Sequence, residues 1–586
     1  MDKNLSTAGI KEYIVKHRGV LLAGLMSLVV VDLLQLFIPR VIKRAVDDLT
    51  TLAATRQDML IYALIILLLA VAMAGFRYAW RRCLIGTSRK IEQDMRSRIV
   101  YHLHTLDAAY FDKTSTGDLM ARATNDINNI RMATGLGIVA LTDAVFLGTA
   151  AIGFMAYINV KLTLYSLIPM PFIVVFTKFF SRRMHRMYLN VQGTFSDMTE
   201  SVRERFAGIR VIKAFDREGA EKAAFEKVSS HYIHQSLNLT RVTGTFFPMM
   251  LFFTNISIAI VIYLGGRQTI TTVITPGDFV AFISYLNLLT WPMMALGWVT
   301  NLIQRGRASF DRINQVLATM PEITEPAEPA GLPDARGCIT VEGLSFTYPT
   351  ASAPSLQNIS FSLEAGNTLC LVGPPGSGKT TLTHLIARLY DPDTGVIRMD
   401  GIDLRSLKTD HLRKAISFMP QEPFLFSGTI KENITFAEDI AVDDPELTAA
   451  ADRAGLTETI ETLSKGFDTI TGERGVVLSG GQKQRVALAR ALYHDAPVVI
   501  LDDPISQVDT ETADHIMAAL KTAARSKTLI IVSHRLSVAR FSDQVIVLDQ
   551  GRILESGSHE DLIKGGGYYE RAWKLQQLEE GRHDGS

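Results

Sequence analysis

Cysteine is scarce in this chain. Among its 586 residues there are three, Cys83, Cys338 and Cys370, and they lie far apart in the sequence. None of the close spacings used by metal-binding motifs or disulfide frameworks is present. An odd, sparse set is typical of reduced thiols in the cytosol, and packing is the role that the sequence favours for all three.

An excess of charge of either sign is also missing. The chain carries 60 Lys and Arg residues and 60 Asp and Glu residues, so its formal net charge is zero. Proteins that bind nucleic acid usually carry a basic excess, and we therefore expect no nucleic-acid partner. There is no internal repeat and no low-complexity tract, and the length indicates at least two domains.

Long apolar runs are what the chain does contain. A hydrocarbon core about 30 Å thick is crossed by roughly 20 helical residues, and helices keep their backbone polar groups paired in lipid. Buried helices of soluble proteins are rarely so long or so free of charge. Six membrane helices are therefore expected, over residues 20–39, 59–76, 135–158, 162–180, 246–266 and 279–299.

The connections between these runs predict their orientation. The second and third runs, and the fourth and fifth, are separated by long stretches rich in basic residues, among them Arg182, Arg183 and Arg186. The other connections are short and poorer in Lys and Arg. Because basic loops stay on the cytoplasmic side, we expect both long loops in the cytoplasm, with helices that extend well beyond the bilayer.

Two aspartates, Asp32 and Asp143, interrupt otherwise apolar runs. A carboxylate in a membrane helix usually faces the interior of the bundle or a wet cavity. The sequence leaves two roles open for them, packing or hydrogen bonding on one side and direct contact with a substrate on the other.

The composition changes after the last run. Residues 320–337 are rich in Pro, Glu and Ala, as linkers are. Beyond them, short apolar strands alternate with helical patterns, which is typical of an α/β domain. The predicted organisation is a membrane domain (1–319), a linker (320–337), an α/β domain (338–578) and a polar tail (579–586).

The stretch "GPPGSGKTT" has the context of a phosphate-binding loop, since a strand-like segment precedes it and a helical one follows. Its glycines let backbone N–H groups point at phosphate oxygens, Lys379 neutralises the terminal phosphates, and the Thr380 hydroxyl is placed for Mg²⁺. Such a loop indicates a nucleoside triphosphatase. The expected nucleotide contacts are Gly373, Pro374, Pro375, Gly376, Ser377, Gly378, Lys379, Thr380 and Thr381.

Three further features accompany this loop. Asp502 follows the apolar strand "VVIL" and can hold Mg²⁺ directly or through water. The segment "LSGGQKQRVALARAL" opens a second helix whose N-terminus suits phosphate. His534 lies just beyond another apolar strand, at the end where α/β sheets bind ligands.

Seven motifs in order carry a family resemblance: "FTYP", "GPPGSGKTT", "PQEPFLF", "TGERG", "LSGGQKQR", "ILDD" and "VSHR". Together they look like the nucleotide-binding domain of an ATP-binding cassette (ABC) transporter. The six predicted helices and long loops resemble an exporter half-transporter of the type IV, multidrug-resistance kind. The resemblance covers essentially the whole chain.

The resemblance implies a role for each matching residue. Tyr348 would stack on adenine, Gln421 would sense Mg²⁺ and the attacking water, and His534 would reach the γ-phosphate. The signature would contact ATP held by the opposite subunit, so a dimer is required. The signature residues and the nearby D-loop aspartate are Ser479, Gly480, Gly481, Gln482 and Asp509.

Three segments resemble the parts that couple the two domains of such exporters. Residues 471–475, with Glu473, resemble an element that contacts the intracellular loops. Residues 110–126 and 208–218 resemble the segments that hold the two coupling helices. For residues 110–126 and 208–218, the alternative to a coupling role is an ordinary solvent-exposed helix.

At Asp503 the sequence departs from the pattern of active family members, which carry glutamate there. The carboxylate that positions the attacking water is shorter by one methylene, about 1.5 Å. A misplacement of around 1 Å can cost roughly a hundredfold in rate, whereas ATP should still bind. Pro504 and "SQVD" (506–509) also replace the small-residue pattern usual before the D-loop aspartate, although Asp509 itself remains, and the signature is intact.

Two interpretations follow. In the first, the chain is the degenerate-site half of a heterodimer whose partner carries the glutamate. This pattern resembles the asymmetric bacterial multidrug exporters, in particular the MdlA-like half-transporters. In the second, the chain forms a homodimer with two slow sites. The resemblance implies ATP-driven export of small hydrophobic or amphipathic compounds by alternating access through the bacterial inner membrane, with the nucleotide-binding domain cytoplasmic. A lipid or peptide exporter and an ATP-gated regulatory assembly remain alternatives, and an importer is disfavoured.

Aromatic and methionine residues of the last two runs are candidates for an adaptable substrate surface. Lipid-facing or packing roles explain most of them equally well. The residues are Phe246, Phe247, Met249, Met250, Phe252, Phe253, Met293 and Met294.

Overall fold

The fold is described from a computed structural model of the chain. It covers residue 13 and residues 15–332, 335–436, 444–472 and 475–583. The chain divides into two compact units. The first comprises Met1–His104 and Gly117–Met320, and the second comprises Thr105–Thr116 and Pro321–Ser586.

The first unit is helical. Six helices in the described part of the chain are long and apolar enough to cross a membrane, and each contains one of the predicted runs and extends past it. The predicted six-helix membrane domain is therefore confirmed. The six helices span Arg18–Thr50, Arg56–Leu103, Thr116–Ile158, Val160–Ala207, Glu218–Ile270 and Pro276–Ala318.

Several of these helices pass through single π-helical turns, where one extra residue shifts the side chains that follow around the helix axis. The elements of the first unit, in chain order, are α2 (Arg18–Thr50), α3 (Arg56–Trp80), η1 (Arg81–Ile85), α4 (Gly86–Leu103), α6 (Thr116–Ala121), η2 (Arg122–Asp126), α7 (Ile127–Met132), η3 (Ala133–Gly137), α8 (Ile138–Thr142), η4 (Asp143–Leu147), α9 (Gly148–Ile158), α10 (Val160–Leu167), α11 (Met170–Ala207), α12 (Ile209–Ala214), α13 (Glu218–Ile260), η5 (Val261–Gly265), α14 (Gly266–Ile270) and α15 (Pro276–Ala318).

Polar contacts fasten the start of α15 to the end of α2. Thr275 and Asp278 form a capping box at the start of α15, and the Gly277 N–H donates to Oδ1 of Asp47 at 2.8 Å. Lys43 Nζ lies 2.5 Å from Oδ1 of Asp278. A Cβ on Gly277 would come within 2.2 Å of the Lys43 carbonyl oxygen, so the two helices approach too closely for any other residue.

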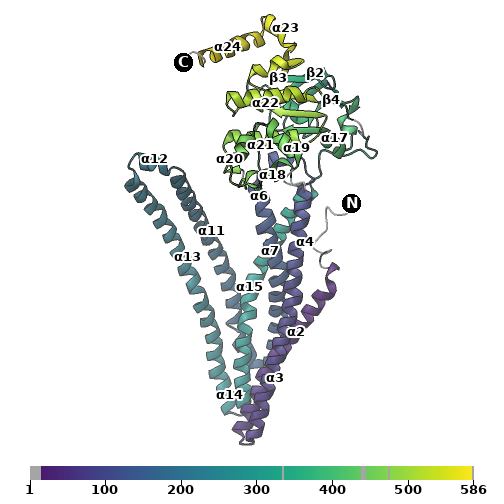
Figure 1. Cartoon of the computed structure of the whole chain (residues 1–586). Helices are drawn as coiled ribbons and strands as arrows, with labels where there is room; N and C mark the ends of the chain where they lie inside the picture. Colours follow the sequence, from purple (N-terminus) through teal and green to yellow (C-terminus); the bar gives the residue numbers. More distant parts are fainter. Residues whose placement is uncertain (1–12, 14, 333–334, 437–443, 473–474, 584–586) are drawn as a thin grey trace. The chain divides into compact units, whose positions relative to one another are not determined.

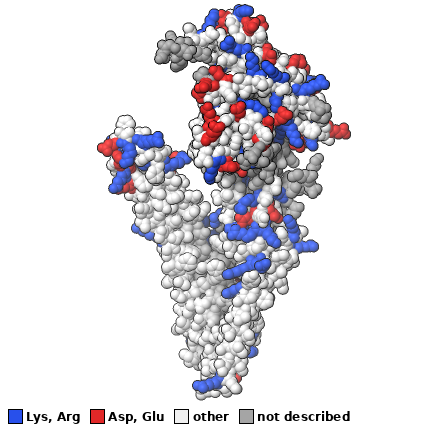
Figure 2. Space-filling model, viewed as in Figure 1, with Lys and Arg blue, Asp and Glu red and all other residues white. Residues whose placement is uncertain are grey.

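Helices α11 and α13 form a hairpin that diverges from the other helices of this unit toward α12 (Figure 1). Buried residues on α11 end at Thr177 and those on α13 begin at Met250. The stretch between them is fully described and contains no buried residue. Figure 2 shows charged residues of both signs gathered at the α12 end of this hairpin, whereas most of the hairpin's visible length is uncharged. The α12 end therefore lacks a packing partner within its own unit.

The second unit is an α/β domain with two sheets. A six-stranded sheet has the order β10-β9-β3-β8-β7-β6, and a four-stranded sheet has the order β2-β1-β4-β5. The strands are β1 (Ile339–Phe346), β2 (Leu356–Leu363), β3 (Thr368–Val372), β4 (Thr394–Met399), β5 (Ile402–Asp403), β6 (Ile416–Met419), β7 (Val498–Asp502), β8 (Thr528–Val532), β9 (Gln544–Asp549) and β10 (Arg552–Gly557).

Helices of this unit connect and cover the strands. They are α5 (Ala108–Lys113), α16 (Lys379–Ile386), η6 (Leu404–Ser406), α17 (Thr409–Ala415), α18 (Ile430–Ile434), α19 (Pro445–Arg453), α20 (Thr457–Thr462), η7 (Gly466–Asp468), α21 (Gly480–Tyr493), α22 (Thr510–Ala523), η9 (Leu536–Phe541), α23 (His559–Lys564) and α24 (Tyr568–His583). Helix α24 thus runs on into the segment expected as a polar tail.

The central strands are buried on both faces, as parallel sheets require. Every residue of β3, β7 and β8 is buried. Alternate residues pack into two hydrophobic clusters; Cys370 and Val372 join the one with α21 and α22, and Leu369 and Leu371 join the one with α16 and the smaller sheet. The predicted α/β domain is confirmed, and Cys370 is a packing residue.

Helix α5, at the tip of the first long loop, belongs to the second unit. Ala109 is buried in the same cluster as strands β1 and β3. Asp112 Oδ2 accepts a hydrogen bond from the Tyr390 hydroxyl at 2.7 Å, and Asp107 Oδ2 accepts one from the Ile323 N–H at 3.0 Å. The sequence alone assigned this segment to the membrane domain, whereas its packing groups it with the α/β domain.

Candidate nucleotide-binding site

Four parallel strands bring most of the predicted site residues to one edge of the large sheet. Strands β3, β8, β7 and β6 are neighbours and end within one residue of one another, with Val532 opposite both Leu371 and Asp502 and with Met419 opposite Leu501. The carboxyl ends of parallel strands form the ligand-binding edge of such sheets. The phosphate loop, His534 and Gln421 follow β3, β8 and β6, and Asp502 is the last residue of β7.

The phosphate loop takes a backbone path open only to glycine. Gly373 and Gly378 have φ angles of 147° and 99°. A Cβ on Gly373 would lie 2.1 Å from the Leu548 carbonyl oxygen, and one on Gly378 would lie 2.7 Å from the Ser355 carbonyl oxygen. The loop then leads directly into α16, so the positive end of that helix faces the loop.

Lys379 is held within the loop. Its Nζ donates hydrogen bonds to the carbonyl oxygens of Gly373 and Pro374, both at 2.9 Å, and to Ser377 Oγ at 3.3 Å. Burial lowers the pKa of this ammonium group from its usual range, while the nearby carboxylates of Asp502 and Asp503 act in the opposite direction. The charge of Lys379 therefore lies between the loop and the acidic pair.

Asp502 ends strand β7 and is 1% exposed. Burial raises the pKa of its carboxyl group, and the hydrogen bond from Thr380 and the charge of Lys379 partly offset the rise. Oδ2 of Asp502 and Oδ1 of Asp503 are buried and have no hydrogen-bond partner in the described part of the chain. Carboxylate and hydroxyl oxygens are the ligands of hard divalent cations, so Thr380 and Asp502 fit Mg²⁺.

Among the described residues no group of three or more His, Cys, Asp or Glu side chains could enclose a metal ion. A cation beside Asp502 would thus need further oxygens from outside the chain. Mg²⁺ is usually bound in this way, by one or two carboxylates together with substrate phosphates.

Asp503 has a left-handed backbone conformation, with φ of 57°. Asp and Asn tolerate this conformation better than longer side chains do. Its N–H donates to the Val532 carbonyl oxygen at 2.8 Å, and its own carbonyl oxygen accepts from Gln484 Nε2 at 2.6 Å. The main chain at Asp503 is therefore fixed from both sides.

Gln484 was not predicted from the sequence. It is 1% exposed on α21, its Nε2 also donates to Ser506 Oγ at 3.0 Å, and its Oε1 accepts from the Gln507 N–H at 2.9 Å. The side chain thus ties the signature helix to the D-loop that follows Asp503. A glutamine among the apolar positions of an amphipathic helix was the signal available in the sequence.

The signature opens α21. Ser479 is the N-cap and forms a capping box with Gln482; Ser479 N–H donates to Gln482 Oε1 at 2.9 Å. Ser479 and Gly480 are exposed, and a Cβ on Gly481 would lie 2.5 Å from the Gln507 carbonyl oxygen. Asp509 caps α22 by accepting from the Thr512 N–H at 2.9 Å. The signature end of α21 is thus open to solvent.

Tyr348 follows β1 and belongs to an aromatic cluster. Its ring lies 5.3 Å from that of Tyr390, and its hydroxyl lies 3.4 Å from His384 Nδ1. Burial raises the pKa of Tyr390, as does its hydrogen bond to Asp112; burial lowers the pKa of His384, and the Asp112 charge acts against this. Tyr390 and His384 were not predicted, because their roles depend on tertiary contacts.

The structure brings Lys379, Thr380, Asp502, Asp503 and His534 within electrostatic reach of one another. Gln421 and His534 are exposed beyond the ends of β6 and β8. Glu473, predicted to contact the intracellular loops, lies outside the described residues.

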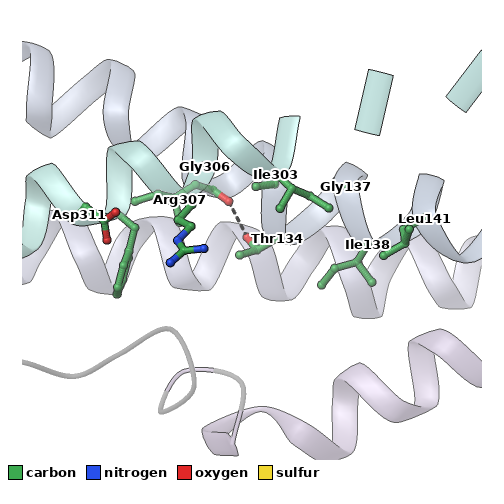
Figure 3. A pocket seen from close by; sticks show the side chains of 11 residues that line it. Thr134, Gly137, Ile138, Leu141, Ile303, Gly306, Arg307 and Asp311 are labelled. Atoms are coloured by element: carbon green, nitrogen blue, oxygen red, sulfur yellow. Dashed lines mark hydrogen bonds between the residues drawn. The ribbon is translucent and has the colours of Figure 1, made fainter. Parts of the chain in front are cut away.

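The described part of the membrane unit contains several cavities, two of which lie between its long helices. One, of about 560 Å³, lies between α11, α13 and α15, and Phe246 and Met294 line it. Met250 is instead buried in the bundle core, and Phe247 and Phe252 are exposed. The other cavity, of about 530 Å³, lies between α7–α8 and α15 (Figure 3).

The fold and the site together define a class: a phosphate-loop ATPase domain joined to a six-helix membrane domain in one chain. Comparison with protein families agrees. The family described as "ABC transporter transmembrane region" matches residues 21–293, and the one described as "ABC transporter" matches residues 356–506. The chain belongs to the ABC transporter family and is an exporter half-transporter, an ATP-binding ATPase and translocase that dimerises with a second half.

Similar proteins cover nearly the whole chain. The "Multidrug resistance-like ATP-binding protein MdlA" of Escherichia coli is 35% identical over 95% of this chain and 94% of its own. The "Probable multidrug resistance ABC transporter ATP-binding/permease protein YheI" of Bacillus subtilis is 34% identical over 95% of each. The "ATP-dependent lipid A-core flippase" of Nitrosococcus oceani is 34% identical over 88% of this chain and 86% of its own.

A solved structure is similar in fold. The "Structure of a bacterial Atm1-family ABC exporter with ATP bound" superposes with a TM-score of 0.77 at 26% identity, covering 97% of this chain and all of that one. The chain is therefore a multi-pass membrane protein with bacterial relatives.

Proposed function

We propose that this chain is the degenerate-site half of a heterodimeric exporter, which uses ATP to move hydrophobic or amphipathic compounds across the bacterial inner membrane. The observation that carries the proposal is a contrast within one domain. The base position holds the short carboxylate of Asp503, whereas the signature end of α21 is complete and exposed.

In the proposed mechanism this chain binds ATP at its own site. Tyr348 stacks on adenine, the glycine loop and Lys379 take the phosphates, and His534 reaches the γ-phosphate. Thr380, Asp502 and Gln421 would hold Mg²⁺, whose charge shields the phosphates. The nucleotide-binding domain faces the cytoplasm, where ATP is available.

Asp503 makes this site slow. Hydrogen bonds fix the main chain on both sides of its Cα, so the backbone cannot move forward to make up for the missing methylene. A base must lie within hydrogen-bond reach of the water that it activates. ATP bound here would persist, while Ser479 and its neighbours complete the site of a partner that carries glutamate.

The α11–α13 hairpin independently supports the need for a second half-transporter. Past Thr177 and before Met250 the α11–α13 hairpin has no buried residue, yet Phe206, Val211 and Phe215 are apolar and exposed around α12. Apolar side chains clustered at a charged helix end fit a protein partner better than solvent. The relatives named for multidrug resistance support an exporter of hydrophobic compounds.

The test compares the purified chain alone with the chain co-expressed with a glutamate-bearing half-transporter from the same genome. We expect slow ATP turnover alone, restored turnover in the pair, and export of a hydrophobic dye by the pair in vesicles. A chain that assembles alone and equals the pair in both assays would establish the homodimer.

A homodimeric lipid exporter is the second candidate, since one relative is named a lipid A-core flippase. It predicts that the chain alone moves a labelled lipid between leaflets. An assembly that binds ATP but moves neither dye nor lipid would instead be regulatory.

A further inference from the structure

The last helix of the described chain, α24, reaches the loop that carries His534. This loop, residues 533–535, joins β8 to η9 and is named the His534 loop. Gln576 on α24 donates a hydrogen bond from its Nε2 to the His534 carbonyl oxygen at 2.6 Å, and its Oε1 accepts one from the Leu536 N–H at 2.9 Å. Gln576 lies 42 residues beyond His534, so the C-terminal helix (Figure 1) makes a tertiary contact with the candidate nucleotide site.

The two backbone groups that Gln576 binds lie between regular elements. Strand β8 ends at Val532, η9 begins at Leu536, and the N-cap residue Arg535 makes no side-chain capping hydrogen bond. The first N–H groups of a helix and the carbonyl groups beyond a strand end find no partner within their own element. One glutamine amide therefore pairs a main-chain donor and a main-chain acceptor on the two sides of Arg535.

The beginning of the His534 loop is fixed by other contacts. The Ser533 N–H donates to the Leu371 carbonyl oxygen of β3 at 3.2 Å, and the Arg535 N–H donates to Ser533 Oγ at 3.0 Å. His534 lies between these groups and is exposed. An exposed side chain has few packing neighbours, so the reach of its ring depends on the direction that the main chain gives to its Cα–Cβ bond. The contacts that fix the loop therefore set the region that the imidazole can reach.

Helix α24 is itself firmly docked. Tyr569 is fully buried in a hydrophobic cluster of this domain, and its hydroxyl lies 2.6 Å from His559 Nδ1. The ring of Trp573 lies 4.8 Å from that of His559, and Glu555 Oε2 accepts a hydrogen bond from the Tyr569 N–H at 3.3 Å. Tyr569, Trp573 and Gln576 stand at positions i, i+4 and i+7, so they share one face of the helix. The two aromatic residues thus hold Gln576 in place.

Apolar burial does not account for the contact between this part of α24 and the loop. Leu575 and Leu578, on either side of Gln576, are 63% and 67% exposed. Gln577 is exposed as well. Gln576 is half-buried, and both of its polar side-chain atoms bind the main chain beside His534.

We propose that Gln576 is a positioning residue for His534, which holds the His534 loop so that the imidazole reaches the γ-phosphate of ATP in this chain's site. The inference rests on the proposed function, since it takes His534 as the γ-phosphate contact. Its consequence is specific: because ADP has no γ-phosphate, a displaced His534 weakens the binding of ATP and leaves the binding of ADP as it was.

The test measures the dissociation constants of labelled ATP and ADP with the full-length chain in nanodiscs, in the presence of Mg²⁺ and in the cold to limit turnover. We expect His534→Ala to weaken ATP binding about tenfold, the scale of a lost hydrogen bond to a charged group. Gln576→Met keeps the length of the side chain but loses both hydrogen bonds, and it should weaken ATP binding about threefold to tenfold. ADP binding should stay within about twofold in both variants. Gln577→Ala, at the exposed neighbour of Gln576, is the matched control and should bind both nucleotides normally.

A double-mutant cycle separates positioning from general stabilisation. In the His534→Ala background, Gln576→Met should cause no further loss of ATP binding, because the ring that it positions is gone. An additive loss, an equal loss for ATP and ADP, or unchanged ATP binding in Gln576→Met would overturn the inference. An unchanged ratio of ATP to ADP affinity in His534→Ala would refute the γ-phosphate contact of the proposed function, and the inference with it. A changed ratio in His534→Ala beside a normal ratio in Gln576→Met would refute the inference alone.

Discussion

At the scale of single residues, Lys379 provides the most direct test of the phosphate loop. Its ammonium group is held by the loop carbonyls close to the acidic pair, so Lys379→Ala removes the fixed counter-ion of the phosphates. We expect occupancy by labelled ATP at this chain's site to fall at least tenfold. Lys414→Ala, an exposed lysine on α17, is the matched control and should bind ATP normally. Unchanged occupancy in Lys379→Ala would refute the assignment.

Asp503→Glu tests the proposed cause of slow turnover. The longer side chain restores the reach to the attacking water, so turnover of the chain alone should rise by roughly ten- to a hundredfold. Glutamate suits the left-handed backbone at this position less well than aspartate, and the melting temperature should fall slightly. Steady-state ATPase assays and thermal unfolding measure both effects. Asp503→Asn is the control, and a gain in that variant as well would exclude the geometric explanation.

Residues that belong to short motifs of known chemistry were predictable from the sequence. Lys379, Thr380 and Asp502 follow buried strands in a recognisable order, and the structure places them together. Tyr390 was not predictable, because it acts through Asp112, far away in the sequence. Gln484 left one signal, a polar residue among the apolar positions of its helix, but its partner Asp503 could not be inferred from it. A buried hydrogen bond between distant residues leaves no periodic signal.

At the scale of elements, the signature end of α21 and the base at the end of β7 serve different sites in the proposed heterodimer. In the pair, Ser479→Ala combined with Gly481→Asp should abolish most ATP turnover, because it removes the contacts to the partner's ATP. Asp503→Asn should lower turnover much less, since that site is already slow. The two variants are compared in co-purified complexes by phosphate release. Equal losses would contradict the degenerate site.

Helix α5 makes one side-chain hydrogen bond to the aromatic cluster around Tyr348, from the Tyr390 hydroxyl to Asp112. Tyr390→Phe removes the bond to Asp112 but keeps the ring packing against Tyr348. A hydrogen bond to a charged group contributes about 1.5–3 kcal/mol. We expect ATP binding to be unchanged and ATP turnover to become less responsive to transported compounds. Asp112→Asn should behave alike. Stimulation of ATPase activity by a hydrophobic dye measures the effect, and full stimulation would disprove this coupling route.

The extent of the elements was only partly predictable. Hydropathy locates the portion of each helix inside the bilayer, so the predicted runs are shorter than the helices that contain them. The polar continuations of α11 and α13 carry no apolar period that marks their ends. Residues 105–116 were assigned by sequence continuity, whereas Ala109 and Asp112 find their partners in the α/β domain.

At the scale of the whole molecule, the exposed end of the α11–α13 hairpin should govern assembly. Phe215→Asp places a charge on the apolar surface beside α12, so we expect less partner to co-purify and lower turnover in the complex. Leu52→Asp makes the same change at an exposed position between α2 and α3 and serves as the control. Pull-down through a tag on this chain measures both. Normal assembly of Phe215→Asp would show that this surface is not the interface.

The place of α5 in the second unit also has a consequence for biosynthesis. Asp112 and Tyr390 are 278 residues apart, and at about 5–20 residues per second the ribosome needs tens of seconds to make the second after the first. During that interval the first membrane helices are complete and Ala109 has no core to enter. The core of the ATPase domain is therefore completed by a segment that the ribosome made much earlier than the rest of that core. A nascent chain stalled before Tyr390 would remain open to proteases at residues 105–116, which gives quality control a place to distinguish finished from unfinished transporters.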